Sequence, residues 1–165
     1  MNEKEFRRLA AEGRVALDVA RIPAEGERIS GETGDILDLR SRYIRPAGGV
    51  EYDLSLSVAG GELLVRGRVK ARLHADCSRC MRPFSFEVEV PGFAEMFEIP
   101  EDDCWIDITD ALREAVILEI PPFPVHDPDC KGLCPQCGAD LNEGPCSCRP
   151  AEGDSRWSAL DGLEI

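Results

Sequence analysis

The clearest pattern along the chain is a pair of runs, residues 50–58 and 65–73, in which apolar and polar residues alternate. Gly60-Gly61 lies between the two runs, and this arrangement is typical of a β-hairpin with a two-residue turn. If the turn is centred on these glycines, the numbers of paired residues sum to 121. Apolar residues then face apolar residues, and Asp53 lies opposite Arg68. Since both faces are satisfied at once, this register is the one we predict.

A third strand follows a loop at residues 77–82. Residues 84–90 alternate again, with phenylalanine and valine on one face and serine and glutamate on the other. A matching register places Glu87 near Arg72 and Glu89 near Lys70. The three runs therefore predict an antiparallel β-meander with one apolar face, and with a basic central strand between two acidic strands on the outer face.

The pattern is less regular elsewhere. Residues 14–21 alternate and predict a strand, whereas the polar, glycine-rich residues 22–34 predict a loop. Residues 45–49 predict a turn, and the acidic residues 91–106 an irregular segment. Four large apolar side chains of that segment are expected to be buried in the core: Phe93, Met96, Phe97 and Trp105.

Residues 107–119 predict the main helix of the protein. Asp107 is the expected N-cap, and Pro121-Pro122 ends the helix, because the residue before a proline avoids the α region. Apolar residues recur at helical spacing, so the helix should cover the apolar face of the sheet; they are Ile108, Ala111, Leu112, Ala115 and Leu118. The fold class is thus α+β. Residues 1–12 and 154–160 predict short terminal helices.

Length and composition predict one α+β domain followed by a small module. The chain has 165 residues, of which 43% are hydrophobic, enough for a core. We divide it into an α+β domain, 1–125, and a zinc-binding C-terminal module with a docking tail, 126–165. No secretory signal and no membrane-length apolar run is evident, so we expect reduced thiols and a cytoplasmic protein without a membrane partner.

The net charge of −13 is unevenly distributed. Residues 1–82 carry a net charge of +2, and residues 129–165 a net charge of −4. Residues 83–128 carry twelve acidic side chains and a single basic one, Arg113. An acidic segment of this kind repels nucleic-acid phosphates and attracts basic proteins.

Five of the eight cysteines lie within residues 130–148. Cys134-Pro-Gln-Cys137-Gly has the spacing of a metal-binding turn, and Cys146-Ser-Cys148 supplies a second pair of thiols. Four thiolates around one ion make a closed site, so we predict a structural zinc ion held by these four cysteines. Cys130 is an alternative ligand that could replace Cys146 or Cys148.

The role of Cys77-Ser-Arg-Cys80 stays open between a metal ligand pair, a redox pair and a plain hairpin loop. A thioredoxin-like motif begins a helix, so a position between two strands argues against redox chemistry. Together with Cys134 and Cys137, this pair could also form a four-cysteine site that joins the tail to the sheet.

One strand carries a row of basic residues. The row could contact RNA phosphates or another partner, or its side chains could pair with acidic residues on the neighbouring strands, as the predicted register favours. The row comprises Arg66, Arg68, Lys70 and Arg72, with Arg79 and Arg82 at its end.

Nothing in the sequence predicts catalysis. The histidines are His74 and His126, and we expect His126 to be a surface residue rather than a general base. Nucleophile, phosphate-loop and dinucleotide motifs are missing, so we predict neither an enzyme nor a small-molecule substrate. A thiol-redox or metal-storage protein is the alternative from another functional class.

Several of these motifs together resemble the YceD family, the large ribosomal RNA subunit accumulation proteins. They are the Cys77-x-Arg79-Cys80 hairpin, the helix that runs into Ile120-Pro-Pro, the signature at residues 130–142, and the tail Asp154-Ser-Arg-Trp157, where serine replaces the usual proline. Some relatives keep the hairpin motif and lack the tail cysteines, which implies that the tail cysteines form a self-contained metal site.

The resemblance implies a bacterial or plastid protein that supports accumulation of large-subunit ribosomal RNA in ribosome assembly, without enzymatic activity. The expected partner is a basic ribosomal protein, bound by the acidic segment, or a ribosomal RNA precursor, bound by the basic row.

Overall fold

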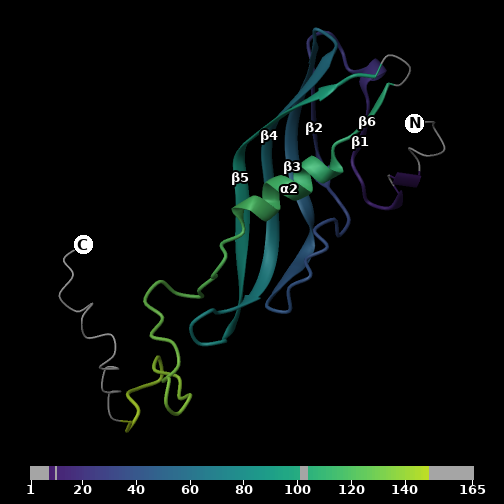
Figure 1. Ribbon diagram of the computed structural model, residues 1–165. Helices are drawn as coiled ribbons and strands as arrows, with labels where there is room; N and C mark the ends of the chain where they lie inside the picture. Colours follow the sequence, from purple (N-terminus) through teal and green to yellow (C-terminus); the bar gives the residue numbers. More distant parts are fainter. Residues whose placement is uncertain (1–7, 10, 101–103, 149–165) are drawn as a thin grey trace, which may run out of the picture.

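The protein is built on a four-stranded antiparallel sheet of order β2-β3-β4-β5 (Figure 1). The computed structural model describes residues 8–9, 11–100 and 104–148. The strands are β2 (Glu27–Glu32), β3 (Ile44–Ala59), β4 (Glu62–Asp76) and β5 (Pro83–Glu98). Two short strands, β1 (Ala16–Asp18) and β6 (Trp105–Asp107), pair with each other, and a 3-10 turn, η1 (Val19–Arg21), follows β1.

The predicted meander and its register are confirmed. Ala59 pairs with Glu62 across the first turn, and the pairs continue in that register along β3 and β4. Gly60 and Gly61 have φ angles of 63° and 86°, the two positive values that a type I′ turn requires. In the second hairpin, Lys70 lies opposite Glu89, as predicted.

Two segments predicted as a loop and a turn belong to strands. Residues 27–32 form the edge strand β2, which the pattern missed because only Ile29 among them is even partly buried. Residues 45–49 lie within β3, where a bulge between Pro46 and Val50 absorbs the extra residues. Gly49 is needed there for close packing, since a Cβ atom would lie 1.9 Å from the Thr33 carbonyl oxygen.

The acidic segment after residue 90 is also a strand, because β5 continues to Glu98. A bulge between the Gly67–Phe93 and Val69–Val90 pairs shifts the pairing by one residue and changes which side chains face the core. Phe93 is therefore buried, as predicted, whereas Met96 is 65% exposed and is not a core residue.

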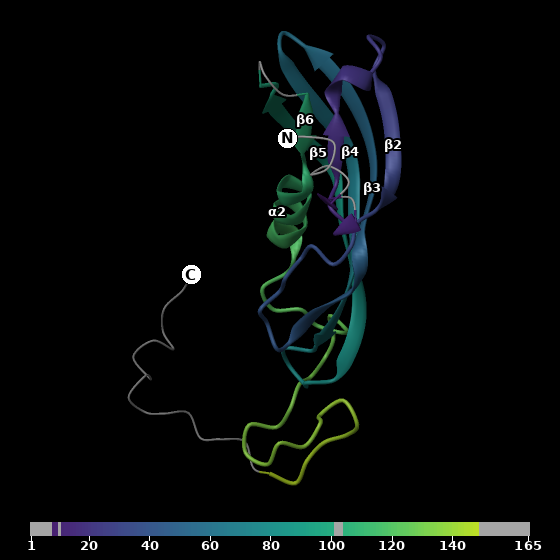
Figure 2. The same ribbon diagram turned by 90° about the vertical axis from the view of Figure 1, so that its right-hand side faces the viewer.

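Helix α2 (Thr109–Glu119) covers one face of the sheet, over β4 and β5 (Figure 2). The residue at the N-cap position is Ile108 and not the predicted Asp107, whose carboxylate nevertheless accepts a hydrogen bond from the Thr109 N–H at 2.9 Å. Leu112 and Val116 are fully buried against the sheet, but Leu118 is 76% exposed, contrary to its predicted core position. The core lies between the helix and the apolar sheet face; its fully buried side chains include Leu54, Leu63, Leu73, Val50, Val65, Val69 and Ile108.

The chain after α2 leads to the far end of the sheet, where the cysteine-rich segment lies beside the loop between β4 and β5 (Figures 1 and 2). The short helix predicted at residues 154–160 lies outside the described residues, as does most of the one predicted at residues 1–12. In the part of the chain that the structure describes, no helix has the length and apolar character needed to cross a membrane.

Candidate metal centres

Seven cysteines and one histidine gather into two groups of four at this end of the sheet. In each group the ligand atoms lie within 4.8 Å of one another. The tail cluster consists of Cys134, Cys137, Cys146 and Cys148, and the hairpin cluster of Cys77, Cys80, His126 and Cys130. Cys104 belongs to neither group.

The tail cluster brings together the four cysteines predicted as zinc ligands. Its first pair lies in a tight turn in which the Gly138 N–H donates to the Cys134 carbonyl at 2.8 Å, and the Cys134 N–H donates to Ala139 at 2.8 Å. Gly138 has a φ of 74°, which glycine adopts without strain. Four sulfur donors around one point suit a tetrahedral ion such as zinc.

The thiols of the tail cluster differ in acidity. Backbone N–H groups of Cys137 and Gln136 stabilise the thiolate of Cys134 and lower its pKa to about 6. A hydrogen bond with Cys137, together with burial, raises the pKa of Cys148 to about 12. One thiolate therefore forms readily, whereas closely spaced thiols resist losing all their protons until a cation offsets the charge.

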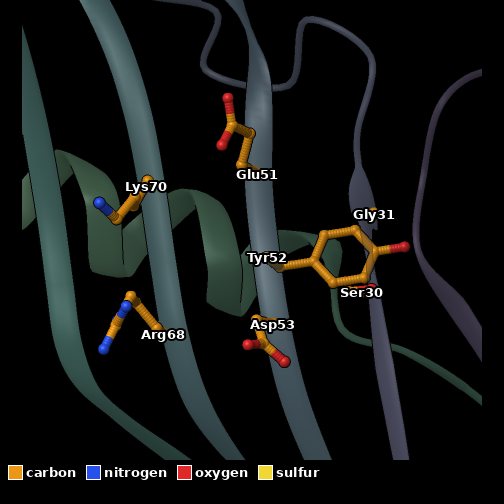
Figure 3. A pocket seen from close by; sticks show the side chains of 7 residues that line it. All are labelled: Ser30, Gly31, Glu51, Tyr52, Asp53, Arg68 and Lys70. Carbon is orange, nitrogen blue, oxygen red and sulfur yellow. The ribbon is translucent and has the colours of Figure 1, made fainter.

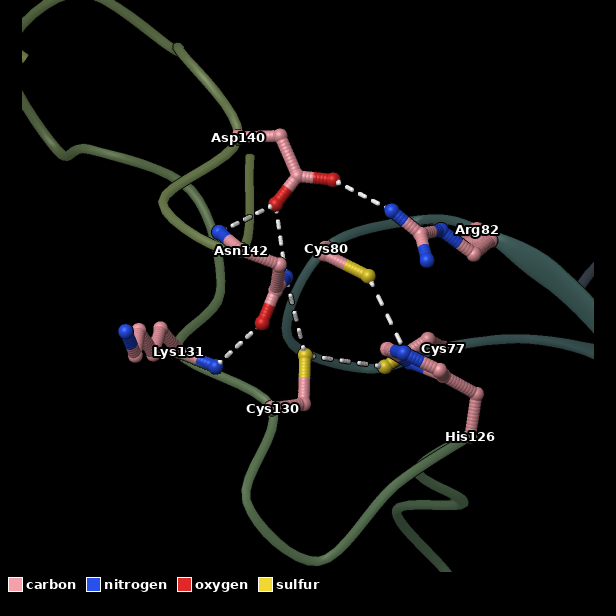
Figure 4. A network of polar contacts seen from close by, with 8 residues as sticks. All are labelled: Cys77, Cys80, Arg82, His126, Cys130, Lys131, Asp140 and Asn142. Atoms are coloured by element: carbon pink, nitrogen blue, oxygen red, sulfur yellow. Dashed lines mark hydrogen bonds and ion pairs between the residues drawn. The ribbon is translucent and has the colours of Figure 1, made fainter. Parts of the chain in front are cut away.

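The hairpin cluster joins two segments that are far apart in the sequence (Figure 4). Cys77 and Cys80 lie in the loop between β4 and β5, and His126 and Cys130 lie in the segment after α2. The Cys77 and Cys130 sulfurs are 3.8 Å apart, and the Cys80 sulfur is 3.6 Å from Nδ1 of His126. All three thiols are buried, and Phe84 and Val125 pack against them.

The sequence alone did not indicate that these four residues lie together. The structure places Cys77 and Cys80 beside Cys130 and His126, rather than with Cys134 and Cys137, and half-buries the histidine that was expected at the surface. Cys130, the alternative tail ligand, belongs to this group. The available signal was a pair of ligand spacings, Cys77-x-x-Cys80 and His126-x-x-x-Cys130.

Hydrogen bonds favour the thiolate form of Cys77 and lower its pKa. Burial opposes the charged form, but the ring and backbone of His126 and the N–H groups of Arg79 and Cys80 outweigh it and lower the pKa of Cys77 to about 5. Burial instead raises the pKa of Cys80.

Polar contacts tie the two clusters together. Asn142, which lies between the two cysteine pairs of the tail cluster, donates from Nδ2 to the Cys130 sulfur at 3.5 Å and accepts the Lys131 N–H at 2.8 Å (Figure 4). Asp140 accepts from Arg82 of the hairpin loop at 3.1 Å and from the side chain of Asn142 at 2.6 Å. The cysteine-rich segment is therefore attached to the hairpin by side chains as well as by the chain itself.

The basic row lies on the outer face of the sheet and is largely paired. Arg68 pairs with Glu89 at 3.2 Å, and Lys70 contacts both Glu87 and Glu89. Arg68 and Lys70 also line a shallow pocket in which the Tyr52 ring reaches over Gly31 (Figure 3).

Of the other members of the basic row, two contact the cysteine-rich segment and two form no ion pair in the described residues. Arg82 pairs with Asp140, and Arg79 donates to the carbonyl oxygens of Pro128 and Cys130, both at 2.9 Å. Within the described residues, Arg66 and Arg72 form no ion pair.

The C-terminal part of the chain is similar to a known protein family. Residues 91–164 match the model of a family described as large ribosomal RNA subunit accumulation protein YceD. An uncharacterized protein of Mycobacterium tuberculosis is 34% identical over an alignment of 126 residues, which covers 67% of this chain and 60% of that protein. The chain thus spans about 60% of the length of this relative.

Two plant proteins match a shorter part of the chain. Both are named large ribosomal RNA subunit accumulation protein YCED homolog 1, chloroplastic. The Arabidopsis thaliana protein is 41% identical over 58 residues, covering 35% of this chain and 18% of its own, and the Zea mays protein is 42% identical over 57 residues, covering 34% and 20%. No solved structure matches.

Proposed function

The chain belongs to the YceD family, and from this premise we propose that it is a non-catalytic ribosome biogenesis factor that supports accumulation of large-subunit ribosomal RNA in the cytoplasm. The observation that carries the proposal is the family match over residues 91–164, a stretch that includes α2 and the tail cluster. The names of the two plant relatives support the same role.

The partner surface that we propose is the outer side of α2. Asp110, Glu114 and Glu119 are exposed on this helix. Its single basic residue, Arg113, donates to the Leu37 carbonyl at 3.3 Å. Glu114 and Glu119 form no ion pair with any residue in the described ranges, so their charge is available to a basic partner.

Two exposed apolar side chains add to this surface. Leu118 lies one helical turn after Glu114, and Phe123 follows the helix; they are 76% and 78% exposed. Large apolar groups beside acidic ones are typical of a protein-binding surface in which a buried anchor supplies affinity and charges orient the partner. We therefore propose that this helix surface, Asp110, Glu114, Leu118, Glu119 and Phe123, binds a basic ribosomal protein.

The state of the basic row supports this choice over direct RNA binding. Arg68 and Lys70 are neutralised by acidic neighbours, and Arg79 and Arg82 hold the cysteine-rich segment. Phosphate contacts made by these four side chains would first require those pairs to be broken, which leaves Arg66 and Arg72 as the members of the row without an ion pair in the described residues.

We assign the tail cluster a structural zinc ion. Residues 134–148 contain no helix or strand, and their carbonyl and N–H groups are joined by only a few turns and one bridge, from Leu133 to Asp140. A bound metal stabilises a segment of this kind in place of an apolar core. Because all four donors come from the protein, this ion has no open position for a substrate.

The proposal is tested by capturing ribosomal components from cell lysate on the tagged full chain, with and without nuclease. We expect a basic ribosomal protein to survive nuclease treatment. Changing Glu114→Gln and Glu119→Gln together should reduce its recovery several-fold, whereas the matched pair Glu25→Gln and Glu27→Gln, exposed at the opposite edge of the sheet, should not.

Two results would contradict parts of the proposal. Equal recovery by the Glu114/Glu119 variant and the wild type would exclude the helix surface, and loss of every partner after nuclease would indicate RNA binding instead. The broader role is tested separately, by deleting the gene and measuring the ratio of large- to small-subunit ribosomal RNA. An unchanged ratio would refute the role in ribosome biogenesis.

A further inference from the structure

We propose that the hairpin cluster, Cys77, Cys80, His126 and Cys130, is a second metal site that takes a zinc-class ion independently of the tail cluster. We further propose that this ion fastens the segment after α2 to the end of the sheet. The inference rests on the geometry of these four residues and does not depend on the ribosomal role.

Two separations between ligand atoms match a tetrahedral zinc site, and all four ligand atoms lie within 4.8 Å of one another. With Zn–S bonds of about 2.3 Å and a Zn–N bond of about 2.0–2.1 Å, neighbouring ligands at tetrahedral angles lie about 3.8 Å apart for two sulfurs and about 3.6 Å apart for a sulfur and a nitrogen. The Cys77 and Cys130 sulfurs are 3.8 Å apart, and the Cys80 sulfur lies 3.6 Å from Nδ1 of His126. A disulfide would instead bring two sulfurs to about 2.05 Å.

The backbone around Cys77 and Cys80 repeats the turn of the tail cluster. Met81 donates from its N–H to the Cys77 carbonyl at 2.9 Å, just as Gly138 donates to Cys134 at 2.8 Å. Cys77 in turn donates to the carbonyl five residues later at 2.9 Å, as Cys134 does at 2.8 Å. The two C-x-x-C pairs therefore present their sulfurs in the same hydrogen-bonded turn.

The backbone conformation of Met81 supports metal binding by the hairpin turn. Its φ is 62°, close to the 74° of Gly138, although a residue with a Cβ atom loses about 1–2 kcal/mol in this conformation. Glycine adopts it freely in the tail turn, but the hairpin turn keeps it with a methionine. A metal bound by Cys77 and Cys80 would stabilise this turn against the local preference.

The surroundings of the cluster resemble the outer shell of a metal site. The three thiols are buried, so that an ion would be shielded from water. Asn142 donates to the Cys130 sulfur, which stabilises a ligating thiolate. Arg79 holds the two carbonyls on either side of Asp129, which fixes the approach of Cys130 to the loop.

Metal binding by the hairpin cluster would release three protons and leave a small negative charge on the site. The three thiols each release one proton, and His126 binds as neutral imidazole through Nδ1, the nitrogen that faces Cys80. A divalent ion with three thiolates leaves a net charge of −1, compared with −2 for the four thiolates of the tail cluster. No electron transfer and no further reactant are required.

The ion would add metal–ligand bonds between two segments that are otherwise joined by hydrogen bonds, one ion pair and apolar packing. Ser78 donates to the Pro124 carbonyl at 2.9 Å, and Leu133 donates to Arg79 at 3.2 Å. Residues 126–130 belong to no helix or strand. A metal bound on both sides of this junction would fix the position of the tail cluster relative to the sheet.

The test is the zinc content of the purified full chain, prepared under reducing conditions. We expect two zinc ions per chain in the wild type and in Cys104→Ser, a cysteine outside both clusters. Cys77→Ser with Cys80→Ser should lower the content to one, and Cys134→Ser with Cys137→Ser should also leave one.

A further variant separates metal binding from a general loss of folding. His126→Cys should keep two ions, but after exchange with Co²⁺ its absorption bands should shift, because a nitrogen ligand has been replaced by sulfur. The same substitution in the chain that lacks Cys77 and Cys80 should shift nothing.

The proposal is overturned by a wild-type content of one zinc ion, by a content that stays at two when Cys77 and Cys80 are replaced, or by a Cys77–Cys130 disulfide found by mass spectrometry in chain isolated without oxidant. A chain that holds two ions and captures no ribosomal component would refute the proposed function and leave this inference intact.

Discussion

Removing the side chain of Asn142 is the sharpest perturbation of the link between the two clusters. Asn142 lies in the tail module but donates to the sulfur of Cys130 at 3.5 Å and accepts the Lys131 N–H at 2.8 Å. Asn142→Ala deletes both contacts, together with the hydrogen bond from Asn142 to Asp140 within the cysteine-rich segment, and leaves every cysteine and histidine in place. We expect it to weaken zinc binding at the hairpin cluster.

The magnitude follows from the two contacts. A typical hydrogen bond contributes about 1 kcal/mol net, so the loss of both should weaken binding by about 2 kcal/mol. That corresponds to a roughly 30-fold lower affinity, since about 1.4 kcal/mol is a factor of ten. The value lies within the roughly 10–100-fold range found when outer-shell partners of metal ligands are replaced.

The assay is competition for zinc with a chromophoric chelator, which resolves the affinities of the two sites in the full chain. Asn142→Ala should weaken one site about 30-fold. Asn142→Asp keeps an acceptor for the Lys131 N–H but replaces the donor to sulfur with a carboxylate that faces the Cys130 thiolate and Asp140, so it should weaken the same site at least as much as Asn142→Ala. Gln136→Ala removes an exposed amide from the tail turn and is the matched control, with no expected effect on the hairpin cluster.

Equal zinc affinities in Asn142→Ala and wild type would refute the reasoning, because the N–H···S contact would then contribute nothing to the metal site. Weakening of the other site alone would also refute it. The Co²⁺ spectrum identifies which site has changed, since only the hairpin cluster has a nitrogen ligand.

Two further predictions concern the fold. Gly67→Ala should lower the free energy of unfolding by about 1–3 kcal/mol or more, because a Cβ atom would lie 2.1 Å from the Asp53 carbonyl oxygen, and the midpoint of urea unfolding should fall with it. The control is Gly92→Ala, which has open space around the new Cβ atom. Equal midpoints for the two variants would contradict the steric argument. Leu112→Ala should lower the unfolding free energy by about 2–5 kcal/mol, since its side chain is fully buried, whereas Leu118→Ala should change it by less than about 0.5 kcal/mol and weaken partner capture instead.

The strands that the pattern predicted correctly share one physical property. Residues 50–58, 65–73 and 84–90 each have one face on the core and one toward water, so the period of two is visible in the sequence, and Gly60-Gly61 sets the register. Strand β2 was missed because it lies at an edge and has almost no buried face. The part of β5 after residue 90 was missed because the bulge after Val90 breaks the alternation.

The sequence also predicted some ion pairs and not others. Alternation was enough to place Glu89 opposite Lys70, with which it pairs, because a correct register determines cross-strand neighbours. It placed Glu87 opposite Arg72, as the structure does, but the Glu87 carboxylate pairs with Lys70 instead. It could not show that Arg82 pairs with Asp140, since that contact joins residues 58 apart in the sequence and depends on where the chain returns after α2.

The two metal clusters show where the sequence alone is sufficient. Residues 134–148 contain all four donors of the tail cluster, and their local spacing predicted this group. Spacing left Cys130 open as an alternative ligand, and only the tertiary structure placed it in the hairpin cluster. The hairpin cluster joins Cys80 to His126 and Cys77 to Cys130, separated by 46 and 53 residues. Only the tertiary structure decided that grouping, because the length of β5 and the direction of α2 determine where the chain after the helix meets the hairpin loop.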